Sequence, residues 1–164
     1  TRRSSDLMTC YYHDEKATAE CLSPDGWLYT GDMARVDEDG FIWLVDRKKD
    51  VIISGGENLY PVQIESFLAA MPKVHDVAVI GLPDPRLGEI AAAIVEAKEG
   101  FQLTEEDINA FCMDLPRYKR PRTVILAKVP RNPTGKIEKP LLRKIYRSEN
   151  LVAQQNEIDM GELQ

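Results

Sequence analysis

The loop from Pro130 to Ile137, with the sequence Pro-Arg-Asn-Pro-Thr-Gly-Lys-Ile, carries the residue best placed for chemistry, Lys136. Its two prolines exclude the segment from a helix interior or a central strand, because proline restricts φ and lacks an N–H. The Thr-Gly pair that follows favours a turn, so we expect the lysine to be exposed on a short arm. Such an ammonium can reach a phosphate or a carboxylate, although a Pro-Thr-Gly-Lys turn is more often a plain surface loop.

Two earlier motifs also carry groups suited to ligand binding. The segment Gly-Trp-Leu-Tyr-Thr-Gly-Asp ends in Asp32, whose carboxylate can accept the two parallel hydrogen bonds of paired ribose hydroxyls. The same Asp could simply form a turn after glycine. Gly55 and Gly56 follow a short apolar run, and glycine permits positive φ and close approach of backbone to a ligand. A tight turn is the simpler explanation of that pair.

The elements that must position these residues are short strands and amphipathic helices. Pro61 suits the first turn of a helix, and Thr104 before three acids is a typical N-cap. Two β-prone runs flank a Glu-Asp-Gly turn at 38–40 and predict a hairpin. We expect an α+β fold, in which this hairpin precedes a small domain with a mixed β-sheet and flanking helices. The expected strands are 27–29, 34–36, 41–45, 51–53, 77–82, 89–97 and 123–129, and the expected helices are 14–22, 61–71, 104–115 and 140–146.

Composition narrows the possible functions. A chain of 164 residues with 43% hydrophobic and 29% charged side chains suits one globular domain, or one small domain with an appendage. Its net charge of −6 argues against nucleic acid as the main partner. Three widely spaced cysteines without a CxxC pair indicate free thiols in a reducing compartment. The two histidines and these cysteines are not spaced as metal ligands are. The sequence predicts neither a membrane span nor a secretory signal.

The order and spacing of five motifs resemble the last third of the adenylate-forming enzymes. This family includes acyl- and aryl-CoA synthetases, luciferase-like enzymes and peptide-synthetase adenylation domains. The resemblance runs from about residue 7 to residue 145. Family members are much longer and carry a Ser/Thr/Gly-rich phosphate loop before this region, which does not occur here, so the chain resembles a C-terminal piece of the enzyme. The motifs are the segments 26–32, 46–50, 54–58, 61–65 and 130–137.

The resemblance implies roles for individual residues. Lys136 matches the catalytic lysine that bridges carboxylate and phosphate oxygens during adenylation. Asp32 and Arg47 match residues that bind the nucleotide. Gly55 and Gly56 match the loop that lines the pantetheine tunnel of CoA, where a bare backbone lets the thiol arm pass. No residue matches a metal ligand, so Mg²⁺ is expected only together with ATP.

Lys49 matches the hinge on which a small C-terminal domain rotates, although a charged run such as 46–50 is more often a solvated loop. The implied domains are residues 1–48, the end of a large AMP-binding domain; 49–147, a mobile lid; and 148–164, a polar tail that is frayed or helical. The missing N-terminal domain is then the main partner of this chain.

The implied activity is that of an AMP-forming acid–CoA ligase of cytoplasmic fatty acid metabolism, with a small carboxylic acid, ATP and CoA as substrates. The fragment alone is expected to be inactive. Two alternatives stay open: an adenylation domain of a peptide synthetase, and a nucleotide-binding module without catalysis. Between residues 117 and 147 there are eleven Lys/Arg and a single acid. A solvated basic face is the plainest interpretation of that stretch, and attraction of ATP and CoA phosphates is the simplest functional one.

Overall fold

The structure, a computed structural model, describes residues 2–3 and 8–147. It contains two compact units, which we call the N-terminal unit (Thr1–Lys49) and the sheet unit (Asp50–Gln164). The division falls one residue after the boundary expected from the charged run. The polar tail expected at 148–164 lies outside the described residues.

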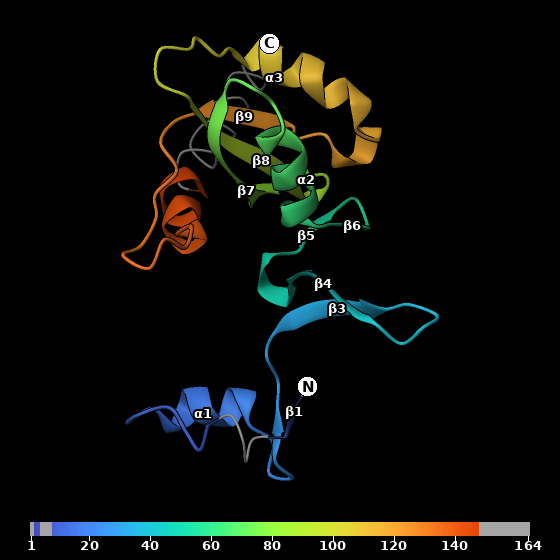
Figure 1. Ribbon diagram of the computed structural model, residues 1–164, viewed down its shortest axis with the longest axis vertical. Coiled ribbons are helices and arrows are strands. Elements are labelled where there is room, and N and C mark those ends of the chain that lie inside the picture. The colour runs from blue at the N-terminus through green and yellow to red at the C-terminus, as the bar shows by residue number, and fades with distance from the viewer. Residues whose placement is uncertain (1, 4–7, 148–164) are drawn as a thin grey trace, which may run out of the picture. The chain divides into compact units, whose positions relative to one another are not determined.

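The described residues of the N-terminal unit form one short helix and two pairs of short strands (Figure 1). Helix α1 begins after Asp14, whose carboxylate accepts a hydrogen bond from the N–H of Ala17 at 2.9 Å and so caps the helix. Strands β1 and β2 pair antiparallel, as do β3 and β4. The bounds are β1 Arg2–Arg3, α1 Glu15–Cys21, β2 Trp27–Leu28, β3 Asp32–Val36 and β4 Ile42–Arg47.

Asp37 organises the turn of the β3–β4 hairpin. Its Oδ1 accepts hydrogen bonds from the N–H groups of Asp39 and Phe41, and its Oδ2 accepts one from the indole Nε1 of Trp43 at 2.7 Å. The pairing register then brings Asp32 opposite Arg47 at the open end of the hairpin. The predicted hairpin therefore has a defined base at which a carboxylate and a guanidinium meet.

The sheet unit is built on a five-stranded mixed sheet in the order β6-β5-β8-β7, with β9 parallel to β8. Strand β8 is central: β7 pairs antiparallel along its whole length, while β5 and β9 share its other side. The bounds are β5 Ile52–Ser54, β6 Glu57–Leu59, β7 Val74–Asp84, β8 Gly88–Ala97 and β9 Thr123–Leu126.

Helices cover both faces of this sheet (Figure 1). Helix α2 begins with Pro61, and α3 begins after Thr104, which forms a capping box with Asp107 as its N-cap pattern predicts. The remaining helical segments are short, apart from residues 139–147, which are α-helical and drawn in red. The bounds are α2 Pro61–Ala69, α3 Glu105–Phe111 and the 3₁₀ turns η2 Lys48–Asp50, η3 Cys112–Asp114 and η4 Arg117–Lys119.

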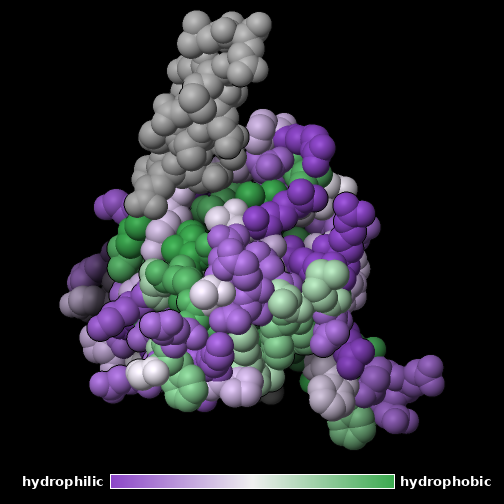
Figure 2. All heavy atoms as spheres, turned by 90° about the horizontal axis from the view of Figure 1, so that it is seen from above, coloured by the Kyte–Doolittle hydropathy of each residue, from purple (hydrophilic) through white to green (hydrophobic). Residues whose placement is uncertain are grey.

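The alternation of side chains along β7 and β8 creates two apolar layers. Val77 and Val79 belong to the layer beneath α2 and α3, whereas Ala78 and Ile80 belong to the layer that also contains Leu142 of helix 139–147. Successive side chains of a strand point to opposite faces, and both faces are buried here, so the strands are almost continuously apolar. Figure 2 looks onto this unit and shows mainly hydrophilic side chains outside, with smaller hydrophobic groups between them.

The predicted α+β class, the mixed sheet and the preceding hairpin are confirmed. One strand was not predicted: the expected strands include none directly after Gly56, but Glu57–Leu59 is strand β6. Strand β6 pairs with β5 and buries only Leu59, so its sequence lacks the alternation of apolar and polar residues that predicts a strand. In the part of the chain that the structure describes, no helix is long and apolar enough to cross a membrane.

Candidate functional site

The Lys136 loop is a hydrogen-bonded turn that closes on itself. Arg131 and Ile137 form a β-bridge across its base, and the backbone N–H of Asn132 donates to the carbonyl of Lys136 at 2.9 Å. The N–H of Gly135 donates to the carbonyl of Asn132 at 2.8 Å. Gly135 has φ of +82°, a conformation that glycine adopts without steric cost. The Gly before the lysine is therefore required by the turn itself.

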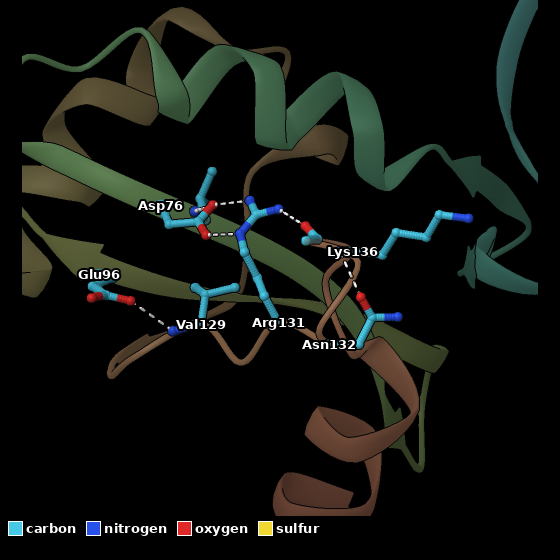
Figure 3. Close-up of polar contacts among 8 residues, drawn as sticks. Asp76, Glu96, Val129, Arg131, Asn132 and Lys136 are labelled. Carbon is cyan, nitrogen blue, oxygen red and sulfur yellow. Dashed lines mark hydrogen bonds and ion pairs between the residues drawn. The ribbon is translucent and has the colours of Figure 1, made fainter.

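The side chain of Asn132 holds the inside of this turn (Figure 3). Its Oδ1 accepts hydrogen bonds from the N–H of Lys136 at 2.9 Å, from the N–H of Thr134 at 3.1 Å and from the Thr134 hydroxyl at 2.7 Å. Asn commonly mimics a backbone turn in this way. The backbone on both sides of the Lys136 side chain is thus held by local hydrogen bonds.

Arg131 connects the turn to the sheet. Its Nε lies 2.6 Å from Oδ2 of Asp76 and its Nη2 lies 2.8 Å from Oδ1 of the same carboxylate, while Nη1 donates to the carbonyl of Gly135 (Figure 3). Asp76 belongs to β7, and its Oδ1 also accepts a hydrogen bond from the N–H of Val77 at 2.9 Å. Each of the three guanidinium nitrogens therefore has a hydrogen-bond partner, and together these bonds connect the loop to strand β7.

The Arg131–Asp76 pair carries opposed pKa shifts. Partial burial alone would raise the pKa of Asp76, but the hydrogen bonds from Arg131 and Val77 and the nearby charges of Arg131 and His75 outweigh it, so the pKa is lowered. The hydrogen bond to Asp76 raises the pKa of Arg131. Both groups are charged at neutral pH, and the stabilisation from the pair is lost only as pH falls through the lowered pKa of Asp76.

The ammonium of Lys136 is exposed, as predicted, and its side chain extends away from the Arg131–Asp76 pair (Figure 3). Within residues 2–3 and 8–147 it has no hydrogen bond or ion pair. The turn therefore presents an unneutralised cation on an ordered backbone, which suits the charge of an incoming anion.

Asp32 and Arg47, which the resemblance implicates in nucleotide binding, meet at the base of the β3–β4 hairpin. Nε of Arg47 lies 3.0 Å from Oδ1 of Asp32. The described residues place no hydrogen-bond donor on Oδ2 of Asp32, so this oxygen stays available to a ligand hydroxyl. The N–H of Lys48 donates to the carbonyl of Gly31 at 2.8 Å and closes the same end of the hairpin.

A hollow of about 670 Å³ opens beside this pair in the N-terminal unit. Three cationic side chains and one acidic side chain contribute to its wall, which therefore carries a net positive charge. Asp32 itself does not line it. The lining residues are Glu20, Thr30, Gly31, Arg47, Lys48 and Lys49.

Gly55 and Gly56 form the two-residue turn between β5 and β6. Their φ values of +59° and +87° match the type of turn that connects tightly paired strands. The N–H of Gly55 donates to the carbonyl of Leu87 at 2.8 Å, and a Cβ added at Gly55 would lie 3.1 Å from Cδ2 of Leu87. A Cβ added at Gly56 would meet no atom within 4 Å. Gly56 therefore leaves open backbone at the tip of the hairpin.

Lys49, the predicted hinge, is an exposed residue of the 3₁₀ turn η2 and the last residue of the N-terminal unit. Its neighbour Asp50 belongs to the sheet unit. Nη2 of Arg143, on helix 139–147, donates a hydrogen bond to Oδ1 of Asp50 at 2.6 Å, and the two side chains form an ion pair. The first residue of the sheet unit is thus tied to its last described helix.

At least four of the eleven basic residues in the stretch 117–147 pair with acidic side chains within the sheet unit, which the sequence did not reveal. Lys139 lies 2.7 Å from Glu65, whose Oε1 also accepts the N–H of Val79. Arg147 lies 3.6 Å from Glu89, and Arg131 and Arg143 are paired as described above. The acidic partners precede this stretch by many residues, so counting charges within the stretch could not find them. These four side chains are partly neutralised by their acidic partners, and attraction of ATP and CoA phosphates by the stretch stays a prediction.

The candidate residues fall into two groups. Asp32, Arg47 and Lys49 belong to the N-terminal unit, where the first two are in contact, whereas Gly55, Gly56 and Lys136 belong to the sheet unit. Among the described residues there is no group of three or more His, Cys, Asp or Glu side chains that could hold a metal ion. All three cysteines are free, and burial raises the pKa of the Cys112 thiol.

The sheet unit, which carries the Lys136 turn, matches a known family. Residues 63–136 match the family described as the AMP-binding enzyme C-terminal domain. The chain carries this C-terminal domain and corresponds to the C-terminal portion of the acyl-CoA ligases that it resembles. The family predicted from the sequence motifs is confirmed.

Individual relatives agree with this assignment. The chain is 48% identical over 146 residues to the long-chain-fatty-acid–CoA ligase FadD13 of Mycobacterium tuberculosis. This alignment covers 88% of the present chain and 29% of FadD13. The structure of the anthranilate CoA ligase AuaEII with anthranoyl-AMP has a TM-score of 0.80 at 31% identity, covering 91% of this chain and 30% of the other. ATP-bound MatB from Rhodopseudomonas palustris has a TM-score of 0.75 at 35% identity, covering 85% and 28%. The chain thus spans less than a third of the length of these relatives.

Proposed function

We propose that this chain is the C-terminal part of an ATP-dependent acid–CoA ligase and supplies its catalytic lysine, Lys136. The observation that carries the proposal is an exposed ammonium without an internal partner, held on a hydrogen-bonded turn in a domain of the AMP-binding family. The overall reaction has two steps: a carboxylic acid and ATP form an acyl-adenylate and pyrophosphate, and CoA then displaces AMP to form a thioester.

Lys136 acts in the first step. A carboxylate oxygen attacks the α-phosphorus of ATP, and the bond to pyrophosphate breaks. Two anions must approach each other, so positive charge placed between them lowers the barrier. The Lys136 ammonium contacts both the acid and the α-phosphate oxygens, and its loss removes charge stabilisation where negative charge develops.

Asp32 and Arg47 bind the nucleotide. Oδ2 of Asp32 accepts a ribose hydroxyl, and Arg47 keeps the carboxylate oriented through its 3.0 Å contact while donating its remaining N–H groups to the ligand. The cationic hollow beside Arg47 adds attraction for the phosphates. Mg²⁺ enters with ATP and is held by its phosphates.

Gly55 and Gly56 serve the second step. The open backbone at the β5–β6 tip lets the slender pantetheine arm pass. The CoA thiol loses its proton and attacks the acyl carbonyl, the bond between acyl carbon and phosphate oxygen breaks, and AMP leaves. Lys49 is the hinge that allows the sheet unit to serve the two steps in turn.

The test separates the two half-reactions in the full-length enzyme that contains this chain. Lys136→Ala should lower acyl-adenylate formation by a factor on the order of 10²–10³. Thioester formation from preformed acyl-adenylate should stay within about twofold of the wild type, because the lysine acts only in the first step. Pyrophosphate release measures the first step, and CoA consumption the second.

Two controls accompany this test. The 164-residue chain alone should release no pyrophosphate above background with any acid, and acetylation of the Lys136 side chain should reproduce the Ala variant by removing its charge. Equal damage to both half-reactions would mean that Lys136 is structural. Adenylate formation without any use of CoA would instead favour a peptide-synthetase adenylation domain.

A further inference from the structure

The guanidinium of Arg131 joins the sheet to the backbone just before Lys136. Two of its nitrogens contact Asp76 at 2.6 and 2.8 Å, and the third donates to the carbonyl of Gly135 (Figure 3). We propose that Arg131, anchored by Asp76, is a positioning residue that sets where the Lys136 ammonium is presented. This inference rests on the proposed role of Lys136.

The anchor belongs to the central sheet. Asp76 lies on the eleven-residue strand β7, which pairs with β8 along its length apart from a register shift between Val74 and Asp76. Its side chain is only 17% exposed, and its carboxylate is itself held by the N–H of Val77 at 2.9 Å. The contact path therefore runs from the sheet through Asp76 and Arg131 to the carbonyl of Gly135, the residue that precedes Lys136.

The remaining polar contacts of the tip are local. The ends of the loop have their own contacts with the sheet unit, since Ile137 packs against the core and the N–H of Val129 donates to Glu96 at 2.9 Å. Asn132 bonds to Thr134 and Lys136 within the turn, so its three hydrogen bonds do not connect the turn to the sheet. At the base, the bridge between Arg131 and Ile137 joins the two ends of the loop to each other. Arg131 is the described side chain that connects the tip of the turn to β7, and a shift of the tip moves the ammonium with it.

The requirement is for a guanidinium, not just for a positive charge. An exposed ion pair contributes little energy by itself, and Arg131 is 45% exposed. Its value lies in a planar fork that reaches a carboxylate with two N–H groups and a carbonyl with a third. Lysine at this position keeps the charge but offers a single point donor, so it can satisfy Asp76 or Gly135 without fixing the angle between them.

The experiment compares Arg131→Lys with the wild type in the full-length enzyme. We expect kcat of adenylate formation to fall about ten- to a hundredfold, since small misplacements of a catalytic group have costs of this size. The KM values for ATP and acid, and thioester formation from preformed acyl-adenylate, should stay within about twofold. Asp76→Asn should give a smaller loss of the same kind, because an amide can accept one of the two hydrogen bonds only.

The matched control is Arg120→Lys. The Arg120 guanidinium also makes several hydrogen bonds, to the carbonyls of Leu115 and Met113 at 2.9 and 2.8 Å, but none to the Lys136 turn. This variant loses the same chemical group and should leave both half-reactions within about twofold. A loss of adenylation equal to that of Arg131→Lys would overturn the proposal, because any lost guanidinium would then have the same effect.

A double-mutant cycle tests whether Arg131 acts through Lys136. Arg131→Lys should cost nothing further in the Lys136→Ala background, because the group that it positions is gone. The same cost in both backgrounds would overturn the proposal.

Amide exchange gives a readout that does not depend on the proposed activity. In the 164-residue chain, Arg131→Lys should speed exchange of the Lys136 N–H about tenfold, whereas Arg120→Lys should not. Unchanged exchange at Lys136 would overturn the positioning role. If Lys136→Ala spares adenylation while exchange responds as expected, the proposed function has failed and the anchoring of the turn by Arg131 has not.

Discussion

The two units of this chain differ in how they bury apolar surface. The hydrophobic residues that the described structure buries all belong to the sheet unit, from Ile52 to Leu142. Among the described residues of the N-terminal unit only Asp46 is buried. Its hairpin instead exposes large apolar side chains, namely Val36, Phe41, Ile42, Trp43 and Leu44.

This difference in buried apolar surface indicates which of the two units can be stable without a further partner. The sheet unit covers both faces of a five-stranded sheet with helices, which is the usual way for a small domain to complete a core. A two-stranded hairpin is only marginally stable without a covering layer. Its large apolar side chains are exposed on both faces, because neighbours along a strand point to opposite sides. We therefore expect the sheet unit to fold independently. The β3–β4 hairpin should need another surface to pack against, which the proposed N-terminal domain would supply.

The largest expected effect comes from breaking the connection between the units at Lys49. In the full-length enzyme, Lys49→Pro should leave adenylate formation measurable and reduce CoA-dependent thioester formation to background. Proline fixes φ near −65° and removes an N–H, so a residue that must reach two backbone states is held in one. Pyrophosphate release measures adenylate formation, and CoA consumption with preformed acyl-adenylate measures thioester formation.

Lys49→Ala is the matched control for the proline variant. Alanine keeps the backbone freedom and removes only an exposed charge, so both half-reactions should change little. If the alanine variant damages thioester formation as severely as the proline variant, the hinge role is wrong and Lys49 acts through its charge.

The next effect compares one substitution in the two units. Ile94 lies on the central strand β8 and is 0% exposed, so Ile94→Ala should lower the free energy of unfolding of the sheet unit by about 2–5 kcal/mol. Urea unfolding followed by far-UV circular dichroism measures this loss, because most of the regular structure belongs to that unit. A change below about 1 kcal/mol would contradict a tightly packed two-layer core.

The smallest effect is expected for the same change on the hairpin. Ile42 lies on β4 and is 71% exposed, so Ile42→Ala should change the stability of the 164-residue chain by no more than about 0.5 kcal/mol. Both tryptophans, Trp27 and Trp43, belong to the N-terminal unit, so their fluorescence reports on it selectively. In the full-length enzyme the cost should rise, because the side chain would then be covered. An equal, small cost in both proteins would mean that nothing packs on this face.

Local patterns were sufficient for much of the fold. The hairpin around Asp39, the helix at Pro61 and the capped helix after Thr104 were predicted because turn, N1 and N-cap preferences act within a few residues. The exposure of Lys136 follows from the prolines and glycine beside it. Five ordered motifs also established the family, since they are read directly from the residues and need no coordinates.

Only the tertiary structure decided how distant residues pair. Strand β6 was missed because its outward polar residues carry no β-pattern, and pairing with β5 stabilises it. Asp76 and Arg131 are 55 residues apart, and the partners of the basic stretch lie on strands and helices far back in the chain. A residue's sequence neighbours determine its local conformation, but the charge that faces it depends on strand register and on the layer that each helix covers. The sequence therefore predicted an exposed lysine on a turn, and the folded sheet decided which distant side chains contact that turn.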